Sequence, residues 1–455
     1  TLTKRRAAGY NIFVHASVAQ MKHDTGDPFV IKSVFIAYLF FSLLAVVLYI
    51  PKLIQLCYAF KKPPHLIAKE KRKISLVIPA RNESRIIGDL FASIERQDYD
   101  RAYFDVNVIV KDPNDPTVEM ARRIGARVFV VEKQTCKGAA LDGYFKALTE
   151  EEFAQYEAFC IIDADDVLET DYVTELNNAL EHPYQIYLSR KRIKNFLGGK
   201  SSRSVFSNCS ALTYPQLDDL ANTYRTRKGI PMNMCGQGMM IRKDVIRAIG
   251  GWPYRTLTED YELRMDCFLK GFTSMYYPYA ILYAEEVIHH KDSYNRRLRW
   301  VTGFSQCDRM YKKRIREQAK ARGAMTAGEF EYFFSLYPVI LFIVTTILTM
   351  CAGAGMAIYY AFCGQDLWIP CLLWLTALPA AVMYVIILLY SLLAMLSFWD
   401  AFSRISAGER LATLLFSPFF MLEYFPIFIQ SRVYARTSLE WEQTERVKYD
   451  REQKK

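Results

Sequence analysis

Three long stretches of the sequence carry almost no charge, and they decide what kind of fold the chain can adopt. Residues 337–363 and 367–398 contain no charged side chain, and residues 31–57 contain only two lysines. Each stretch can supply the ~20 consecutive apolar residues that a bilayer-spanning helix needs. The first lacks the small-residue cleavage site of a signal peptide, which favours a retained anchor. We therefore expect one transmembrane helix near the start of the chain and two more in its second half.

A fourth apolar stretch, residues 411–430, is interrupted by Pro418, Glu423 and Pro426. Basic residues flank both of its ends, so the distribution of positive charge does not indicate whether it crosses the membrane. The interruptions favour an interfacial or re-entrant helix, and a full crossing is the alternative.

The net charge of +10 is concentrated beside the apolar stretches. Basic residues cluster in 61–73, after the first stretch, and in 312–322, before the second, whereas the short loop 364–366 carries only an acid. The positive-inside rule then places residues 61–323 in the cytosol, in a multi-pass protein of the plasma membrane. The position of these clusters indicates contact with the lipid bilayer and its anionic headgroups, and not with nucleic acid.

Other composition features exclude several classes of protein. The ten cysteines form no C-x-x-C pair and several lie in apolar stretches, so neither a disulfide framework nor a zinc site is expected. His289 and His290 are adjacent and point apart on any regular element, which disfavours chelation of one ion. The apolar stretches carry almost no charge of the kind that ion pathways use, so a channel or transporter has little support.

The cytosolic region alternates short β-branched runs with helical patterns. Strands are predicted at residues 74–78, 106–110, 127–131 and 159–162, and helices at 84–96, 118–124, 137–151 and 261–269. This alternation predicts an α/β domain whose mostly parallel sheet is covered by helices on both faces. Right-handed crossovers bring the carboxyl ends of the strands to one edge, where ligands bind.

Polar side chains follow three of these strands. Residues 81–83 come after the first, Asp112 after the second, and Asp163 and Asp165 after the fourth. The alternate carboxylates of Asp163-x-Asp165 can surround one hard cation and leave coordination positions for phosphate oxygens, although an ordinary acidic turn has the same pattern. Lys137 opens a predicted helix, where it can meet a phosphate at the helix N-terminus, and an exposed lysine is the alternative.

A second acidic pair lies where a loop meets a helix. Thr258 is a plausible N-cap, which places Glu259 and Asp260 in the first helical turn. A carboxylate there accepts from free backbone N–H groups and meets the positive end of the helix dipole. A helix-capping acid and a catalytic acid are both compatible with this position.

Six motifs in this order, between these apolar stretches, resemble the membrane-integrated family 2 glycosyltransferases. The most similar members are the processive synthases of cellulose, hyaluronan, chitin and poly-N-acetylglucosamine. The motifs are Pro79-Ala80-Arg81-Asn82-Glu83, Asp112, Lys137-Gly138, Asp163-Ala164-Asp165, Thr258-Glu259-Asp260 and Arg296-x-x-Arg299-Trp300. The resemblance covers almost the whole chain, and Trp441-x-x-Thr444-x-Arg446 is similar to endings seen in this group.

The resemblance implies a Rossmann-like GT-A domain joined to transmembrane helices, and an inverting transferase that uses a nucleoside-diphosphate sugar. On the donor side it implies that the nucleoside is held by Ala80, Glu83 and Asp112, other donor groups by Lys137 and Asp163, and Mg²⁺ or Mn²⁺ by Asp165. On the acceptor side it implies Asp260 as general base beside Glu259, a diphosphate and acceptor site of Arg296, Arg299 and Trp300, and an acceptor lining of Gly236 and Gln237.

Two departures from the family pattern concern the same side of the site. Arg296 stands where Gln is more common, which adds a positive charge to the acceptor floor, and Gly236-Gln237-Gly238 replaces the more usual G-T-G. The function that the resemblance implies is extension of a β-linked polysaccharide from a UDP-sugar, with UDP-GlcNAc favoured, and threading of the product through the membrane helices. The alternative is non-processive transfer to a lipid or lipid-linked acceptor.

These observations together predict seven segments. They are a polar or interfacial segment 1–30, a transmembrane helix 31–58, a cytosolic GT-A domain 59–310, interfacial helices 311–335, two transmembrane helices 336–398, an interfacial, re-entrant or transmembrane helix 399–440, and a cytosolic tail 441–455.

Overall fold

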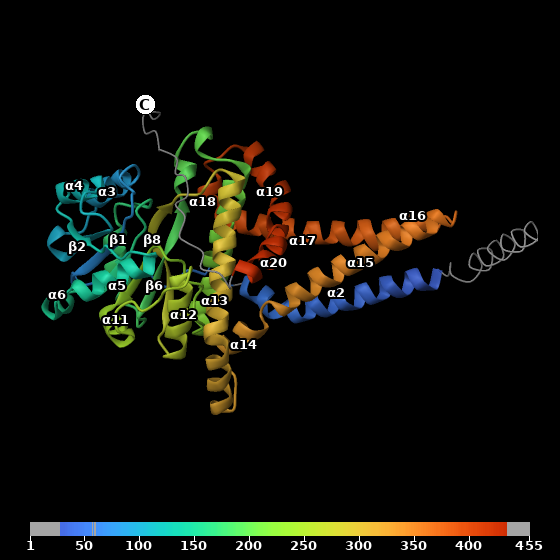
Figure 1. The fold of residues 1–455 in the computed structure, drawn as a ribbon, viewed down its shortest axis with the longest axis horizontal. Helices are drawn as coiled ribbons and strands as arrows, with labels where there is room; N and C mark the ends of the chain where they lie inside the picture. The colour runs from blue at the N-terminus through green and yellow to red at the C-terminus, as the bar shows by residue number, and fades with distance from the viewer. Residues whose placement is uncertain (1–27, 57, 59–60, 435–455) are drawn as a thin grey trace, which may run out of the picture. The chain divides into compact units, whose positions relative to one another are not determined.

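The computed structural model describes residues 28–56, 58 and 61–434 (Figure 1). The predictions for the first 27 residues and for the tail from residue 435 on lie outside this part of the chain. Two compact units divide the chain. The first combines the chain up to Ile54 with Tyr332–Leu389, and the second combines Gln55–Glu331 with the residues from Tyr390 on.

The first unit consists of apolar helices. It contains α2 (Pro28–Leu56), α15 (Tyr337–Phe362), α16 (Trp368–Pro370), the π-helix η5 (Cys371–Ala377) and the first part of α17 (Leu378–Ser397). Its small buried core joins α2 to α15 and η5, and the rings of Phe35 and Trp374 meet edge to face at 5.8 Å. Four segments of the described chain are long and apolar enough to cross a membrane: Pro28–Ile50, Ala327–Phe362, Trp368–Ser397 and Ala407–Val433.

The second unit is built around an eight-stranded sheet with the order β3-β2-β1-β4-β7-β6-β8-β5. The strands are β1 (Ile74–Pro79), β2 (Phe104–Val110), β3 (Arg127–Val130), β4 (Ala158–Ile161), β5 (Val167–Leu168), β6 (Ile186–Ile193), β7 (Met239–Arg242) and β8 (Ser274–Ala284). The four predicted strands are β1 to β4, and they pair in parallel. β7 runs antiparallel to both β4 and β6, and β5 runs antiparallel to β8. The sheet is therefore mixed, with parallel pairs in the majority.

Helices cover both faces of this sheet, as predicted. Alternate residues of β1 enter different cores: Ile74, Leu76 and Ile78 belong to one, and Val77 belongs to the other. The first core is shared with α3 (Ile87–Glu95), α4 (Pro116–Arg123) and α7 (Tyr172–Ala179), and the second with α5 (Lys137–Ala147), α11 (Lys243–Ile249) and α12 (Glu259–Leu269). Such period-two alternation is what a strand buried on both faces requires.

The predicted helix 137–151 is confirmed up to Ala147 and is wrong only near its end. It ends at Ala147, and a short helix α6 (Glu150–Ala154) begins after Thr149. Thr149 Oγ1 accepts from the N–H of Glu152, and the Glu152 carboxylate accepts from the N–H of Thr149. This capping box stabilises a new helix start and so interrupts the continuous helical pattern.

The second unit contains further helical elements. They are η1 (Arg101–Tyr103), η2 (Lys194–Leu197), η3 (Lys200–Ser202), α8 (Val205–Ala211), α9 (Thr213–Pro215), the π-helix η4 (Gln216–Asn222), α10 (Thr223–Lys228), α13 (His290–Arg322), α14 (Ala327–Phe334), α18 (Trp399–Phe402), α19 (Ala407–Leu422) and α20 (Tyr424–Tyr434). The predicted boundary at residue 310 falls inside α13, a helix of 33 residues.

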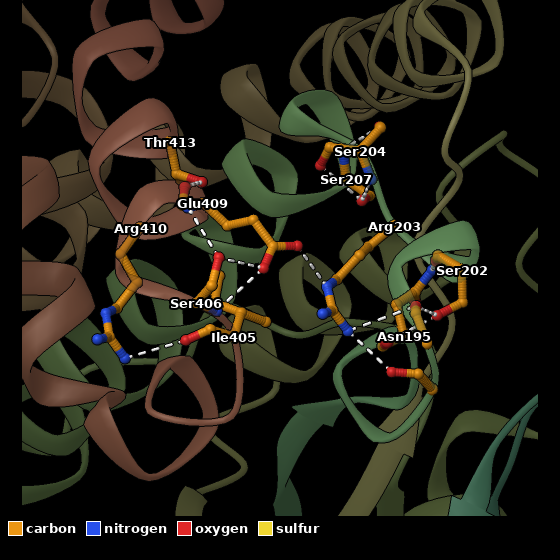
Figure 2. Close-up of polar contacts among 12 residues, drawn as sticks. Asn195, Ser202, Arg203, Ser204, Ser207, Ile405, Ser406, Glu409, Arg410 and Thr413 are labelled. Carbon is orange, nitrogen blue, oxygen red and sulfur yellow. Dashed lines mark hydrogen bonds and ion pairs between the residues drawn. The ribbon is translucent and has the colours of Figure 1, made fainter. Parts of the chain in front are cut away.

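The interrupted stretch 411–430 forms the two helices α19 and α20, which meet at Glu423. α19 lies against α8, and α20 lies against α13. Figure 2 shows the polar contact that fixes α19: Arg203 Nε donates to Glu409 Oε1 at 2.7 Å, while Arg203 Nη1 donates to the carbonyl of Gly198 at 2.8 Å. Both helices therefore belong to the unit that contains the sheet, and their relation to the bilayer stays a prediction.

Candidate active site

The carboxyl ends of the parallel strands bring the predicted polar residues to one edge of the sheet. Ala80 follows β1, Asp112 follows β2 and Asp163 follows β4. Because β7 is antiparallel to β4, the segment Gly236–Gly238 that precedes β7 reaches the same edge. The N–H of Gly238 donates to the carbonyl of Ile161 at 2.9 Å, which fixes this segment beside the end of β4.

Lys137 is the centre of the site. Its Nζ donates to Asp163 Oδ1 and to the carbonyl of Gly236, both at 2.5 Å, and lies 3.8 Å from Glu259 Oε1. A Cβ on Gly236 would lie 3.1 Å from this Nζ and 3.5 Å from Asp260 Oδ2. The structure thus places five predicted site residues, from four separate segments of the chain, around one point.

The electrostatics of this cluster favour a cation surrounded by carboxylates. Burial lowers the pKa of Lys137, but the carboxylates of Asp163 and Glu259 raise it by more than burial lowers it. The pKa therefore lies above its ordinary value, and the ammonium stays charged. Burial raises the pKa of Glu259 to about 7; Lys137 opposes this increase and Asp260 adds to it. Glu259 therefore titrates in a buried site with a specific cationic partner, which is a pattern typical of functional sites.

Asp260 combines the two properties that its sequence position left open. Its Oδ1 accepts from the N–H of Tyr261 at 2.8 Å, as an acid in the first turn of a helix does. Burial nevertheless raises its pKa more than the Tyr261 N–H and Lys137 lower it. Desolvation thus outweighs the helix terminus, and the carboxylate is a better proton acceptor than a solvent-exposed cap.

Thr258 occupies the predicted N-cap position of α12, but its side chain caps nothing. Its hydroxyl lies against α13, where a Cβ on Gly303 would be only 2.4 Å from Oγ1. The contact between Thr258 and Gly303 therefore sets how closely α13 approaches the start of α12, which carries Glu259 and Asp260.

The loop after β4 concentrates acidic side chains. Asp166 is fully buried, and its Oδ2 accepts from the N–H of Asp163 at 3.0 Å. Burial raises the pKa of Asp166 well above its ordinary value, and Asp165 and Asp163 raise it further. Its Oδ1 has no hydrogen-bond partner in the described part of the chain. Mutual repulsion among hard oxygen donors and an unsatisfied buried carboxylate oxygen are features that a divalent cation at this loop would relieve, so these residues fit one.

The protein does not supply a complete coordination shell at this loop. Within residues 28–56, 58 and 61–434, no group of three or more histidine, cysteine or carboxylate side chains forms a metal site. A cation bound at Asp165 would therefore need further oxygen ligands, of the kind that a diphosphate provides.

The residues assigned to the nucleoside line a different part of the edge. Ala80 and Glu83 are buried, and the N–H of Ala80 donates to the carbonyl of Ile109 at 2.8 Å. Asp112 is exposed, and its Oδ1 accepts from the N–H of Asn114 at 2.8 Å. The neighbouring Asp115 is structural, because its two carboxylate oxygens accept from the N–H groups of Thr117 and Asn82 and so join the β1 and β2 loops. In the described part of the chain, no hydrogen bond or ion pair joins Asp112 to the Lys137 cluster.

Helix α13 presents Arg296, Arg299 and Trp300. Burial and the neighbouring Arg296 lower the pKa of Arg299 below its ordinary value, while the carboxylates of Glu259, Asp163 and Asp260 raise it. Arg299 therefore lies within electrostatic range of the Lys137 cluster. Arg296 points its guanidinium over the Trp300 ring, 4.9 Å from the centroid, and Nη2 donates to Glu286 Oε1. The predicted triplet is therefore on one helix, but its two arginines have different surroundings.

Two carboxylates beside α13, the buried Glu286 and the partly buried Glu423, were not predicted as site residues from the sequence. Glu286 pairs with Arg296, and Glu423 accepts from Arg297 Nη2 through one oxygen and contacts His290 Nε2 at 2.8 Å through the other. Arg297 is 1% exposed and lies over the Phe420 ring at 3.9 Å. An acid directly after a strand, and a lone acid inside an apolar stretch, are the signals that could have indicated them.

The geometry agrees with what known proteins show. A family model of the glycosyl transferase family group 2 matches residues 158–399, which is more than half of the chain. The chain belongs to this family. Its sequence is 22% identical over 237 residues to the probable glycosyltransferase YdaM of Bacillus subtilis, covering 52% of this chain and 56% of that protein. It is 21% identical over 252 residues to the poly-beta-1,6-N-acetyl-D-glucosamine synthase of Staphylococcus aureus (strain COL), covering 54% of this chain and 58% of that synthase.

The glycosyltransferase fold extends over most of the chain. A solved structure of the mannosyltransferase PcManGT from Pyrobaculum calidifontis, in complex with GDP-Man and Mn²⁺, superposes with a TM-score of 0.54 at 16% identity. The match covers 90% of this chain and 99% of that one. The matched regions span less than two thirds of the length of either curated relative. The predicted family, the GT-A fold class with apolar helices and the glycosyltransferase class are confirmed.

Proposed function

We propose that this glycosyltransferase extends a β-linked polysaccharide from a UDP-sugar, with UDP-GlcNAc the favoured donor, and passes the product through its membrane helices. The observation that carries the proposal is the contact cluster of Lys137, Asp163, Gly236 and Glu259, with Asp260 beside it. The similarity to a poly-beta-1,6-N-acetyl-D-glucosamine synthase and the candidate membrane helices support a polymer as the product.

The proposed reaction is a direct displacement with inversion. The acceptor hydroxyl oxygen attacks the anomeric carbon, the bond to the diphosphate oxygen breaks, and Asp260 takes the hydroxyl proton. A raised pKa makes Asp260 a stronger base than an exposed aspartate. The departing diphosphate gains negative charge, which the Lys137 ammonium and the Arg299 guanidinium would stabilise.

The donor would lie along the strand edge. Ala80, Glu83 and Asp112 would bind the nucleoside, and Asp163 and Lys137 would contact the sugar and phosphates. Mg²⁺ or Mn²⁺ held by Asp165 would offset charge on the diphosphate. Gly236 and Gln237 would line the acceptor side, where the indole of Trp300 offers a flat apolar face to a sugar ring.

The decisive experiment compares Asp260→Asn with wild-type protein in purified form. Asparagine keeps the size and the capping ability of aspartate but accepts no proton, so transfer should fall by ~10²-fold or more. UDP affinity should remain, because the nucleotide contacts are assigned to other residues. Near-normal transfer would return Asp260 to a purely structural cap. The size of the product separates a processive synthase, which releases long chains, from an enzyme that adds single sugars to a lipid acceptor.

A further inference from the structure

Arg296 and Arg299 lie one turn apart on α13, yet their surroundings differ. Arg296 Nη2 donates to Glu286 Oε1, Nη1 donates to the carbonyl of Glu285 at 3.4 Å, and the planar face covers Trp300. Within the described ranges of the chain, Arg299 forms no hydrogen bond or ion pair. A guanidinium that already donates to a carboxylate has few N–H groups left to donate to a phosphate, whereas the N–H groups of Arg299 are available.

Glu286 is built into the structure as a fixed, buried anion. Its side chain is 0% exposed, and the hydroxyl of Tyr214 donates to the same Oε1 at 2.7 Å. The backbone of Glu286 is held from both sides by Asn195, whose Oδ1 accepts from the Glu286 N–H at 2.7 Å and whose Nδ2 donates to the Glu286 carbonyl at 2.8 Å. Glu286 therefore cannot follow a moving partner, and it sets where Arg296 lies.

Glu286 in turn needs Arg296 to balance its negative charge. Its Oε2 is buried and has no hydrogen-bond partner among the described residues. A buried carboxylate without a paired cation is strongly unfavourable, so the two side chains stabilise each other only as a pair. As a pair they are neutral, and the positive charge of Arg296 is cancelled beneath the site.

We infer that Glu286 is a positioning residue that neutralises Arg296 and, through Arg296, fixes Trp300 as the floor of the acceptor subsite. Of the two arginines, Arg299 then binds the departing diphosphate. This inference rests on the proposed function and assigns different roles to two arginines of one motif. Two residues that follow Asn195 connect it to α19. Ser202 Oγ donates to the Asn195 carbonyl, and the adjacent Arg203 donates to Glu409 of α19 (Figure 2). The acceptor floor is therefore anchored to the C-terminal helices.

The test measures the binding of UDP and of GDP to purified full-length protein with Arg296→Gln, Arg299→Gln, Glu286→Gln and the double variant Glu286→Gln/Arg296→Gln. Arg299→Gln should weaken binding of the nucleotide that wild-type protein binds by roughly tenfold or more, as loss of a charge-assisted hydrogen bond does. Arg296→Gln should change it by less than about threefold, the range expected of a charge that is already paired.

Trp300 provides a second, independent readout. The fluorescence of Trp300 is the part of the emission that Trp300→Phe removes, and it should shift in Arg296→Gln and in Glu286→Gln. In the same two variants, KM for a β-linked N-acetylglucosamine oligosaccharide should rise more than kcat falls. The double variant restores a neutral pair, so it should fold at least as well as Glu286→Gln and match Arg296→Gln in nucleotide affinity.

Three outcomes are separable. Equal losses of nucleotide affinity in Arg296→Gln and Arg299→Gln would make Arg296 a diphosphate ligand and overturn the inference. Unchanged Trp300 emission in Arg296→Gln would overturn the positioning role, and this measurement does not need Glu286→Gln to fold. If wild-type protein binds neither nucleotide, the proposed donor class fails instead, and the Trp300 emission still decides the positioning role.

Discussion

Replacing Gly303 by alanine tests whether the placement of the catalytic carboxylates depends on one helix contact. The added Cβ would lie 2.4 Å from Thr258 Oγ1, 2.7 Å from its Cγ2 and 2.9 Å from its Cβ. Ordinary contacts begin at 3.4 Å, so α13 and the start of α12 must separate by ~1 Å at this point. Thr258 directly precedes Glu259 and Asp260, and both would move with it.

The expected effect is larger on catalysis than on folding. Overpacking of this kind costs ~1–3 kcal/mol of stability, whereas a displacement of about 1 Å at reacting groups can cost ~10²-fold in rate. Transfer from a radiolabelled UDP-sugar should therefore fall by about that factor. UDP affinity should fall less, because Arg299 is the one assigned donor contact on α13, whereas Lys137 lies on α5 and Asp163 follows β4.

A matched control and a rescue make the test decisive. Gly408→Ala adds the same methyl group in α19, where no atom lies within 4 Å, and should leave transfer unchanged. Thr258→Gly removes the atoms that collide, and it sacrifices no capping bond, so Gly303→Ala/Thr258→Gly should recover most of the lost activity. The reasoning is refuted if Gly303→Ala keeps more than about half of the wild-type rate, or if the rescue fails in a protein that unfolds at the wild-type temperature.

Three further predictions follow from the site and from the charge pattern. Burial raises the pKa of Glu259 from 4.5 to about 7, so folded protein binds more protons than unfolded protein between these pH values. Denaturant titration should therefore show that stability falls as pH rises from 4.5 to about 7, and that it falls less steeply in Glu259→Gln. Excess chelator should abolish transfer, and Asp165→Asn should lose the Mn²⁺-dependent part of donor binding without loss of fold, by calorimetry. Residues 61–323 should resist protease in sealed right-side-out vesicles, and cleavage there from outside would reverse the proposed topology.

Much of the architecture was determined by local sequence. The apolar stretches, the four parallel strands and the helix that starts at Glu259 are all read from composition, β-branched runs and chain breaks, because each depends on neighbouring residues only. The edge on which Asp163 and Lys137 meet was also predictable, since parallel strands with right-handed crossovers place their carboxyl ends together.

The capping box at Thr149 shows the limit of such reading. Helical periodicity continued through residue 151, but two reciprocal hydrogen bonds started a new helix. The second half of the sheet was equally hidden, because β5 to β8 are separated by long, mostly helical segments, and their mixed pairing is set by contacts distant in sequence.

The division of labour within the site was decided by tertiary structure alone. The motif Arg296-x-x-Arg299-Trp300 gives both arginines the same chemistry, and only the fold brings Glu286, ten residues earlier, against one of them. For Asp260, the sequence showed a helix terminus that lowers the pKa, while burial, which raises it, required the packed site. Charge pairing and desolvation depend on which atoms exclude water around a side chain, and that is a property of the assembled fold, not of neighbouring residues in the chain.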